Sequence, residues 1–313
     1  MTVDILVNPR ARGIGASGSL RRALLDAASR GRARVHTTTS LDDLERAAHD
    51  IAARGTTGVI VAGGDGTHMT ALSALARAFG PDLPPIGLAP CGTVSTVARN
   101  LGARGGARAW TVRLVGAACA GEARRRPQLT LRVRDDGGGE RIGFIFGAGL
   151  VARFFDVYYA LPRQGRASAA AVAARVFAGS FVGSVFARRV LEPAAATVSV
   201  DGRLVDGRAW TLLVASVVRD VGLHFLVTYR AREQSDAFHV VGSGLPARRL
   251  GPQLPRVLTG RPLRGEPRID AVARALDVRF DGAPDRYVLD GDTFAAGAVE
   301  VGVGPLVTIL SPP

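Results

Sequence analysis

The stretch Val59-Ile-Val-Ala-Gly-Gly-Asp-Gly-Thr67 decides the fold of this chain. Its apolar first half is typical of a buried strand, and a helix-like segment follows directly after it. Gly63, Gly64 and Gly66 lack the side chains that would keep a phosphate group away from the backbone, and the next helix offers unpaired N–H groups to an anion. The stretch predicts a phosphate-binding turn in which Asp65 lies beside a metal ion or a nucleotide hydroxyl. The alternative is an ordinary strand-to-helix turn with a capping residue.

Around this stretch, the composition is that of a folded protein. A chain of 313 residues with 47% hydrophobic and 21% charged residues can form two domains with a substantial core. The formal net charge is +13, and all 40 basic residues are arginine. Aromatic residues do not interleave with the arginines, so we expect no nucleic-acid partner. A positive surface favours phosphorylated nucleotides or acidic lipid headgroups instead.

The sequence also indicates a cytoplasmic protein. Cys91 and Cys119 cannot build a disulfide framework, and the N-terminus lacks the pattern of a secretory signal. The longest apolar region, residues 169–187, is interrupted by Arg175, so we do not expect it to span a membrane.

Strand and helix patterns alternate over the first 125 residues, as a parallel α/β sheet requires. Ser40, with Asp43 three residues later, is a predicted helix N-cap, and Gly55 a predicted helix stop. The predicted strands are residues 3–7, 34–37, 59–62 and 86–89, and the predicted helices are residues 19–30, 41–54 and 68–79.

From about residue 128 the predicted segments become short, β-rich and separated by glycine turns, which favours an antiparallel domain. The predicted strands there are residues 129–134, 141–146, 197–200, 210–216 and 238–241, with a hairpin tip at 135–139. Residues 151–190 should be helical, either as a helical pair that packs on the core or as an apolar face for a membrane. We therefore predict an α/β fold with a Rossmann-like nucleotide-binding domain over residues 1–125 and a β-rich, sandwich-like domain over residues 126–295.

Two further loops accompany the glycine turn. Pro90-Cys-Gly92-Thr93 also lies between a strand and a helix, and Asn8 and Gly13 follow the first strand. Ligands of α/β folds bind where the carboxyl ends of neighbouring strands meet. The three loops are therefore expected to form one site.

These loops resemble the three signatures of the diacylglycerol kinase catalytic domain, a family that includes bacterial lipid kinases and sphingosine kinases and is distantly related to NAD kinases. The signatures are Asn8-Pro9 with Gly13, Gly63-Gly-Asp-Gly-Thr67, and Pro90-x-Gly92-Thr93. Leu289-Asp-Gly-Asp292 resembles the Asp-Gly-Glu or Asp-Gly-Asp element of the family. The resemblance covers the second domain more loosely, and it implies that the last strands, within residues 296–313, return to the first domain.

The resemblance implies ATP-dependent phosphoryl transfer to a lipid hydroxyl of diacylglycerol or sphingoid type. Asp292 would act as the general base, and Asp65 would join it as a catalytic residue. Mg²⁺ would be held by carboxylates, for which Asp290 and Asp236 are the candidates. The residues expected at the nucleotide are Asn8, Pro9, Gly13, Thr38, Gly63, Gly64, Asp65, Gly66, Thr67, Gly92 and Thr93.

The sequence departs from the family where carboxylates are expected. Thr70 stands where the family usually has Glu, and Ser95-Thr96 stands in place of an Asn-Asp pair. An Asp-Gly-x-Leu-Asp element, tied in the family to magnesium, has only residues 235–238 as its nearest match, without the glycine. Hydroxyls bind Mg²⁺ more weakly than carboxylates, so the metal site is either rearranged or impaired.

Two alternatives to a lipid kinase stay open. One is an NAD kinase-like enzyme, and the other is a catalytically impaired nucleotide- or lipid-binding protein of the same fold. The expected partner is a lipid substrate at a membrane surface, with peripheral contact to the anionic inner face, and the chain is compatible with a homodimer.

Overall fold

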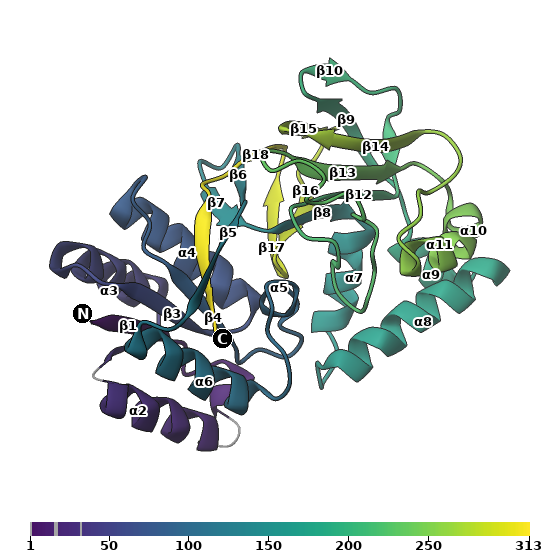
Figure 1. Cartoon of the computed structure of the whole chain (residues 1–313). Helices are drawn as coiled ribbons and strands as arrows, with labels where there is room; N and C mark the ends of the chain where they lie inside the picture. The colour runs from purple at the N-terminus through teal and green to yellow at the C-terminus, as the bar shows by residue number, and fades with distance from the viewer. Residues whose placement is uncertain (1, 16–17, 32) are drawn as a thin grey trace. The chain divides into compact units, whose positions relative to one another are not determined.

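The computed structural model describes residues 2–15, 18–31 and 33–313. The chain forms two compact units, the first made of Met1–Thr130 and Pro305–Pro313 and the second of Leu131–Gly304 (Figure 1).

The first unit is built on one sheet with the strand order β2-β1-β3-β4-β19-β5. Five of these strands are parallel, and β5 runs antiparallel to β19. Every residue of β1, β3 and β4 is buried, the pattern of strands covered on both faces. The strands are β1 Val3–Val7, β2 Arg34–Thr37, β3 Gly58–Gly63, β4 Ile86–Pro90, β5 Arg124–Gln128 and β19 Val307–Ser311.

The helices of the first unit follow from amphipathic spacing and capping. In α2 the buried residues Leu20, Leu24 and Ala28 recur every four positions and face the core. Ser40 caps α3 by accepting a hydrogen bond from the Asp43 amide, as predicted. The helices are α1 Arg12–Gly15, α2 Ser19–Gly31, α3 Leu41–Arg54, α4 Asp65–Phe79, α5 Thr96–Asn100 and α6 Ala107–Ala120.

One helix boundary was predicted wrongly. The helix α4 begins at Asp65 rather than at residue 68, because Gly64 is extended and serves as its N-cap. Part of the predicted glycine turn is therefore the first turn of a helix.

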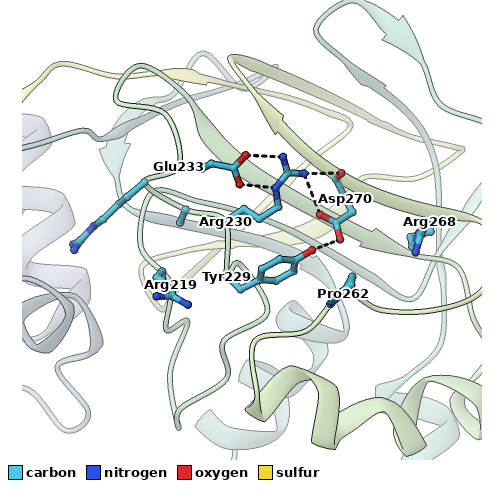
Figure 2. A pocket seen from close by; sticks show the side chains of 9 residues that line it. Arg219, Tyr229, Arg230, Glu233, Pro262, Arg268 and Asp270 are labelled. Carbon is cyan, nitrogen blue, oxygen red and sulfur yellow. Dashed lines mark hydrogen bonds and ion pairs between the residues drawn. The ribbon is translucent and has the colours of Figure 1, made fainter.

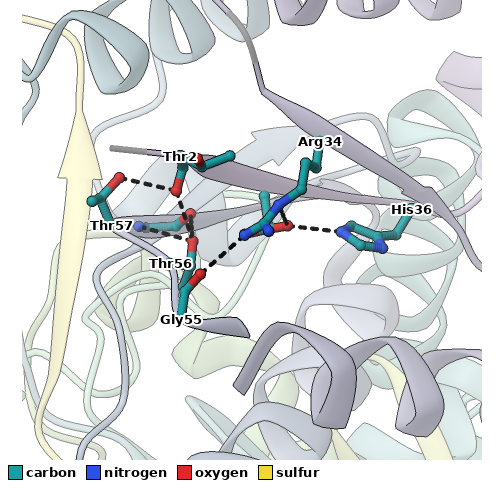
Figure 3. Close-up of polar contacts among 8 residues, drawn as sticks. Thr2, Arg34, His36, Gly55, Thr56 and Thr57 are labelled. Atoms are coloured by element: carbon teal, nitrogen blue, oxygen red, sulfur yellow. Dashed lines mark hydrogen bonds and ion pairs between the residues drawn. The ribbon is translucent and has the colours of Figure 1, made fainter. Parts of the chain in front are cut away.

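A buried carboxylate joins β2 to β1. The Asp4 side chain is fully buried and accepts hydrogen bonds from Arg34 Nε and Nη2 at 2.9 and 2.8 Å. Nε2 of His36 lies 2.8 Å from the same carboxylate, and Figure 3 shows Arg34 and His36 converging from β2. Burial alone would raise the pKa of Asp4, but the hydrogen bonds from His36 and Arg34 lower it overall. Asp4 therefore stays ionised within the sheet.

The second unit contains two sheets whose strand pairs are antiparallel. Their orders are β10-β9-β15-β18-β6-β7, with β11 also on β9, and β14-β13-β12-β8-β16-β17. The predicted fold class, a parallel α/β part followed by a β-rich part, is confirmed. The strands are β6 Leu131–Asp135, β7 Glu140–Gly143, β8 Ile145–Gly149, β9 Ala194–Val200, β10 Arg203–Leu204, β11 Ala209–Trp210, β12 Leu212–Ser216, β13 Phe238–Ser243, β14 Arg268–Ala273, β15 Ala275–Phe280, β16 Asp285–Leu289, β17 Asp292–Ala296 and β18 Ala298–Val303.

Two predicted strands are each divided between these sheets. Residues 141–146 contribute to β7 and β8, and residues 210–216 contribute to β11 and β12. An apolar run fits the buried face of either sheet, so hydrophobicity alone does not reveal the crossover. The return to the first unit also begins later than the predicted residue 296, because β18 pairs with β6 and β15 in the second unit.

The predicted helical region of the second unit forms α7, α8 and α9. Val172 and Val176 of α8 join a buried cluster with Leu212 and Val214 of β12, and Phe186 packs against the cluster. The helices are α7 Leu150–Tyr159, α8 Arg166–Val182, α9 Val185–Val190, α10 Ala247–Leu250, the 3-10 helix η1 Gly251–Gln253 and α11 Leu254–Leu258. None of the helices in the described ranges is both long and apolar enough to cross a membrane.

Candidate functional site

Three loops meet at the carboxyl edge of the parallel sheet in the first unit. The first loop, residues 8–13, follows β1, the second, residues 63–67, ends β3, and the third, residues 90–96, ends β4. These strands are parallel neighbours, so their ends lie side by side. This is the edge at which α/β sheets bind ligands.

The second and third loops touch through their backbones. A Cβ atom on Gly92 would lie 2.4 Å from the Cα of Gly64, so only glycine fits at this crossing. The amide of Cys91 donates to the Gly63 carbonyl at 2.8 Å. The two loops therefore meet backbone to backbone beside the N-terminus of α4, where no side chain caps the helix and the N–H groups of the first turn can bind an anion.

The first loop is fastened to both of the others. Gly13 donates its amide to the Cys91 carbonyl at 2.9 Å, and a Cβ there would lie 2.7 Å from that oxygen. Nδ2 of Asn8 donates to Oγ1 of Thr67 at 2.9 Å. Pro9 continues the turn between these two contacts. The structure thus brings together the residues that the sequence placed in three separate motifs.

Thr38 lies at the adjacent edge of the sheet, directly after β2. Its amide donates to the Val7 carbonyl at 3.0 Å, and its hydroxyl is 3.4 Å from the same oxygen. Its buried position beside the end of β1 places it next to the first loop.

Asp65 connects the second loop to the third. Its carboxylate accepts hydrogen bonds from the backbone amides of Thr96 at 2.8 Å and Val97 at 3.0 Å. Those amides open α5, so Asp65 acts as an N-cap supplied by another helix. Gly66 lies in the first turn of α4, and Thr93 lies in the third loop before α5.

Thr70 and Ser95, at positions that depart from the family, differ in the contacts of their hydroxyl groups. Oγ1 of Thr70 donates to the carbonyls of Gly66 and Thr67 at 3.0 and 3.2 Å, so it bonds back to its own helix. Ser95 has a φ of 53°, and its buried Oγ has no hydrogen-bond partner among the described residues.

Two residues near the loops belong to the core. His68 is buried, with Nε2 3.2 Å from the Ala89 carbonyl, and burial lowers its pKa to about 4. Its imidazole is therefore neutral near pH 7. Burial raises the pKa of the Cys91 thiol to about 12, so it is not a reactive thiolate.

In the second unit, Asp290-Gly291 forms the tight turn that joins β16 to β17. Both residues have positive φ, 48° and 94°, as a two-residue hairpin turn requires. The buried carboxylate of Asp290 accepts from the amides of Phe144 and Ile145 at 2.9–3.1 Å. The Tyr159 hydroxyl donates to the Gly291 carbonyl at 2.6 Å. The hairpin turn and the hydrogen bonds of the Asp290 carboxylate therefore explain the Asp290-Gly291 pair in structural terms.

Asp292 follows this turn as the first residue of β17. Burial raises the pKa of its carboxyl group, and no charge or hydrogen bond from the described residues opposes this effect. A carboxylate with a raised pKa on a fixed turn has the character of a general base.

The two predicted metal ligands have other partners in the structure. Asp290 is engaged by backbone amides, and Asp236 forms an exposed ion pair with Arg274. Within the described ranges, no group of three or more His, Cys, Asp and Glu residues is arranged to hold a metal ion. Metal binding by Asp290 and Asp236 stays a prediction.

A comparison with known protein families matches the part of the chain that contains the three loops. Residues 2–124 match the diacylglycerol kinase catalytic domain. The match covers most of the first unit, and this part of the chain is similar to that family. No curated protein matches the sequence.

Solved structures extend the similarity of fold to the second unit. A provisionally named diacylglycerol kinase from Bacillus anthracis str. Sterne has a TM-score of 0.70 at 14% identity, covering 100% of this chain and 95% of that chain. A diacylglycerol kinase structure from the same strain has a TM-score of 0.64 at 13% identity, covering 100% and 97%. At such low identity these similarities establish the fold.

Proposed function

We propose that this protein is a lipid kinase of the diacylglycerol kinase type, which transfers the γ-phosphoryl group of ATP to a lipid hydroxyl. The proposal rests on the contact between the backbones of Gly64 and Gly92 beside the N-terminus of α4. At this contact no side chain would keep a phosphate chain away from the backbone amides. The family implies the use of ATP.

The nucleotide site would use mostly backbone groups. Amides of residues 64–67 and 92–93 would donate to phosphate oxygens, as at other glycine turns that open a helix. Asn8 would orient the second loop through its bond to Thr67, and Thr38 would border the site at the end of β2. ATP supplies the transferable phosphoryl group, and the loops would hold it in position.

Asp292 would accept the proton of the attacking lipid hydroxyl. Burial raises the pKa of its carboxyl group, which brings it closer to the operating pH and makes it a better base than an ordinary aspartate. The hairpin turn at Asp290-Gly291 would fix its position.

Magnesium fits the residues of this chain less well than ATP does. Enzymes of phosphoryl transfer commonly bind Mg²⁺ through carboxylates. Here Thr70 occupies the expected Glu position and bonds to its own helix, while both carboxylate oxygens of Asp65 accept backbone amides. No step is therefore assigned to the metal. The same observation favours a second candidate function, a nucleotide-binding protein with impaired transfer.

A lipid acceptor requires contact with a membrane, and the second unit has an apolar surface suited to it. Phe181, Val182 and Val185, where α8 ends and α9 begins, are 54%, 73% and 74% exposed. Arg188 and Arg189 follow on α9 and could meet anionic headgroups. We expect replacement of the three apolar residues by serine to weaken binding to anionic vesicles severalfold in a flotation assay, while ATP binding is retained. Equal flotation of both proteins would count against this surface.

A transfer assay with radiolabelled ATP tests the function. The acceptors are diacylglycerol, a sphingoid base, phosphatidylglycerol and NAD, each compared with a no-acceptor control. Transfer to a lipid is the expected result, and transfer to NAD alone would support an NAD kinase-like enzyme. Measurable ATP binding without transfer to any acceptor would support the impaired binding protein.

A further inference from the structure

The second unit contains a polar cavity that no sequence motif indicated. It is broadly open to solvent and has a volume of about 980 Å³. Its lining comes from separate segments of the chain, which explains why sequence spacing does not reveal it. The lining residues are Arg219, Tyr229, Arg230, Ala231, Arg232, Glu233, Pro262, Arg268 and Asp270 (Figure 2).

Both acidic groups of this cavity are hydrogen-bonded to neighbouring side chains. Asp270 accepts a hydrogen bond from the Tyr229 hydroxyl at 2.6 Å and lies 2.9 Å from Nε2 of His239. Glu233 accepts two hydrogen bonds from Arg230, at 2.8 and 2.9 Å. In Figure 2 Arg230 and Tyr229 both point toward Asp270. Nη1 of Arg230 also lies 3.6 Å from Oδ1 of Asp270, so one guanidinium serves both carboxylates of this wall of the cavity.

His239, which contacts Asp270 in this wall, stays neutral. The backbone amide of Arg230 donates to Nδ1 of His239 at 3.3 Å, so Nε2 carries the proton and faces Asp270. Burial is the largest effect on the His239 pKa and lowers it. The wall therefore keeps its charge pattern near neutral pH.

The remaining charge of the cavity is positive. Four arginines line it against two carboxylates, an excess of two positive charges. The Arg219 guanidinium forms no ion pair with the described part of the chain, and Nε of Arg268 is 3.8 Å from Glu266, whose side chain is 75% exposed. An ion pair so open to solvent contributes little and is easily replaced.

We propose that this cavity is a binding site for a phosphate group, with Arg219 and Arg268 as its main contacts. Guanidinium groups pair with phosphate through two parallel N–H donors, and this match is stronger than with most other anions. The cavity is larger than a bare phosphate, so the ligand is an organic phosphate, either a soluble phosphomonoester or the headgroup of a phospholipid. All the lining residues belong to the second unit, so the proposal does not depend on phosphoryl transfer at the loops of the first unit.

Calorimetry with glycerol 3-phosphate at low salt tests the soluble form of the ligand, and flotation with phosphatidic acid in phosphatidylcholine vesicles tests the headgroup. The main variant is Arg219→Gln with Arg268→Gln. Arg219→Gln alone serves as a second variant, because it removes a guanidinium without an ion pair. Arg203→Gln is the control, since Arg203 is exposed on β10 outside the cavity.

At least tenfold weaker binding of one of these probes by the double variant, with binding by Arg203→Gln unchanged, is the expected result. The probe that is lost identifies the source of the phosphate. Any phosphate held by the loops of the first unit contributes equally to all variants and cancels in this comparison. Equal binding by the double variant and the control for both probes would overturn the proposal, as would equal binding by Arg219→Gln if the double variant does not fold.

Discussion

The carboxylate of Asp65 accepts a hydrogen bond from the backbone amide of Thr96 at 2.8 Å, so the first residue of the helix that begins in the second loop also caps the helix that follows the third. Asp65 thus holds the two loops in register. The sequence suggests Asp65 as a contact for a metal ion or a nucleotide, and the structure shows that it also joins the two loops.

Asp65→Asn tests this task. One amide oxygen cannot replace two carboxylate oxygens, and the new NH₂ group would face the Thr96 or Val97 amide. We expect the free energy of unfolding to fall by about 1–3 kcal/mol, the scale of hydrogen bonds to a charged group. Urea unfolding provides the measurement, with Asp82→Asn, at an exposed loop residue, as control. Equal stability of the two variants would show that the capping bonds contribute nothing.

Gly92→Ala tests the phosphate cradle. Its Cβ would lie 2.4 Å from the Cα of Gly64, so the loops must separate and their amides move. ATP binding measured by calorimetry should weaken by about tenfold or more, equivalent to about 1.4 kcal/mol. Gly116→Ala is the matched control, because that helical glycine has no atom within 4 Å of its added Cβ. An unchanged ATP affinity of Gly92→Ala would show that the nucleotide binds elsewhere.

Asp292→Asn tests the proposed general base. Loss of proton acceptance should reduce turnover by about 10²–10⁴-fold, while ATP affinity is retained. Asp206→Asn, at an exposed position of the same unit, is the control. Unchanged turnover in Asp292→Asn eliminates the assignment.

The pH dependence of turnover offers an independent measure of Asp292. Burial raises its pKa, so the base is protonated and inactive at a pH where an ordinary aspartate, with a pKa of about 3.9, is still ionised. The acidic limb of the pH–rate profile should therefore lie above about pH 4. An acidic limb at or below that value would contradict the assignment.

Asp4→Asn tests the buried clamp between β1 and β2. At pH 7 the variant should lose roughly 2–3 kcal/mol, near the lower end of the cost of breaking a buried ion pair, because Arg34 is partly exposed. The folded-state pKa of Asp4 is lowered, so its contribution is present above the unfolded pKa of about 4 and is lost as the pH falls through the folded value. The stability gap between wild type and variant should therefore shrink on acidification. Asp26→Asn, which breaks only an exposed ion pair with Arg30, should change stability little at either pH.

The sequence predicted the local parts of the fold well. Alternating apolar runs and caps such as Ser40 identify the strands and helices of the first unit, because these signals act over a few residues. It failed where one apolar run serves two sheets, at residues 141–146 and 210–216, because burial looks the same in both.

In the candidate site too, local features were predictable from the sequence and long-range contacts were not. Three glycine motifs were recognisable because each carries its own turn chemistry. The Gly64–Gly92 crossing, the engagement of Asp290 by the Phe144 amide and the arginine-lined cavity join residues far apart in sequence.

The sequence by itself determined the fold class and the three loops and indicated the resemblance to the family, because glycine and strand patterns are local features of the chain. Only the tertiary structure decided what the charged groups do. The strand order sets which amides reach Asp65 and Asp290, and the packing of distant segments brings Arg219 and Arg268 into one cavity with hydrogen-bonded carboxylates. Electrostatic roles depend on distances through space, and those distances are fixed by the fold.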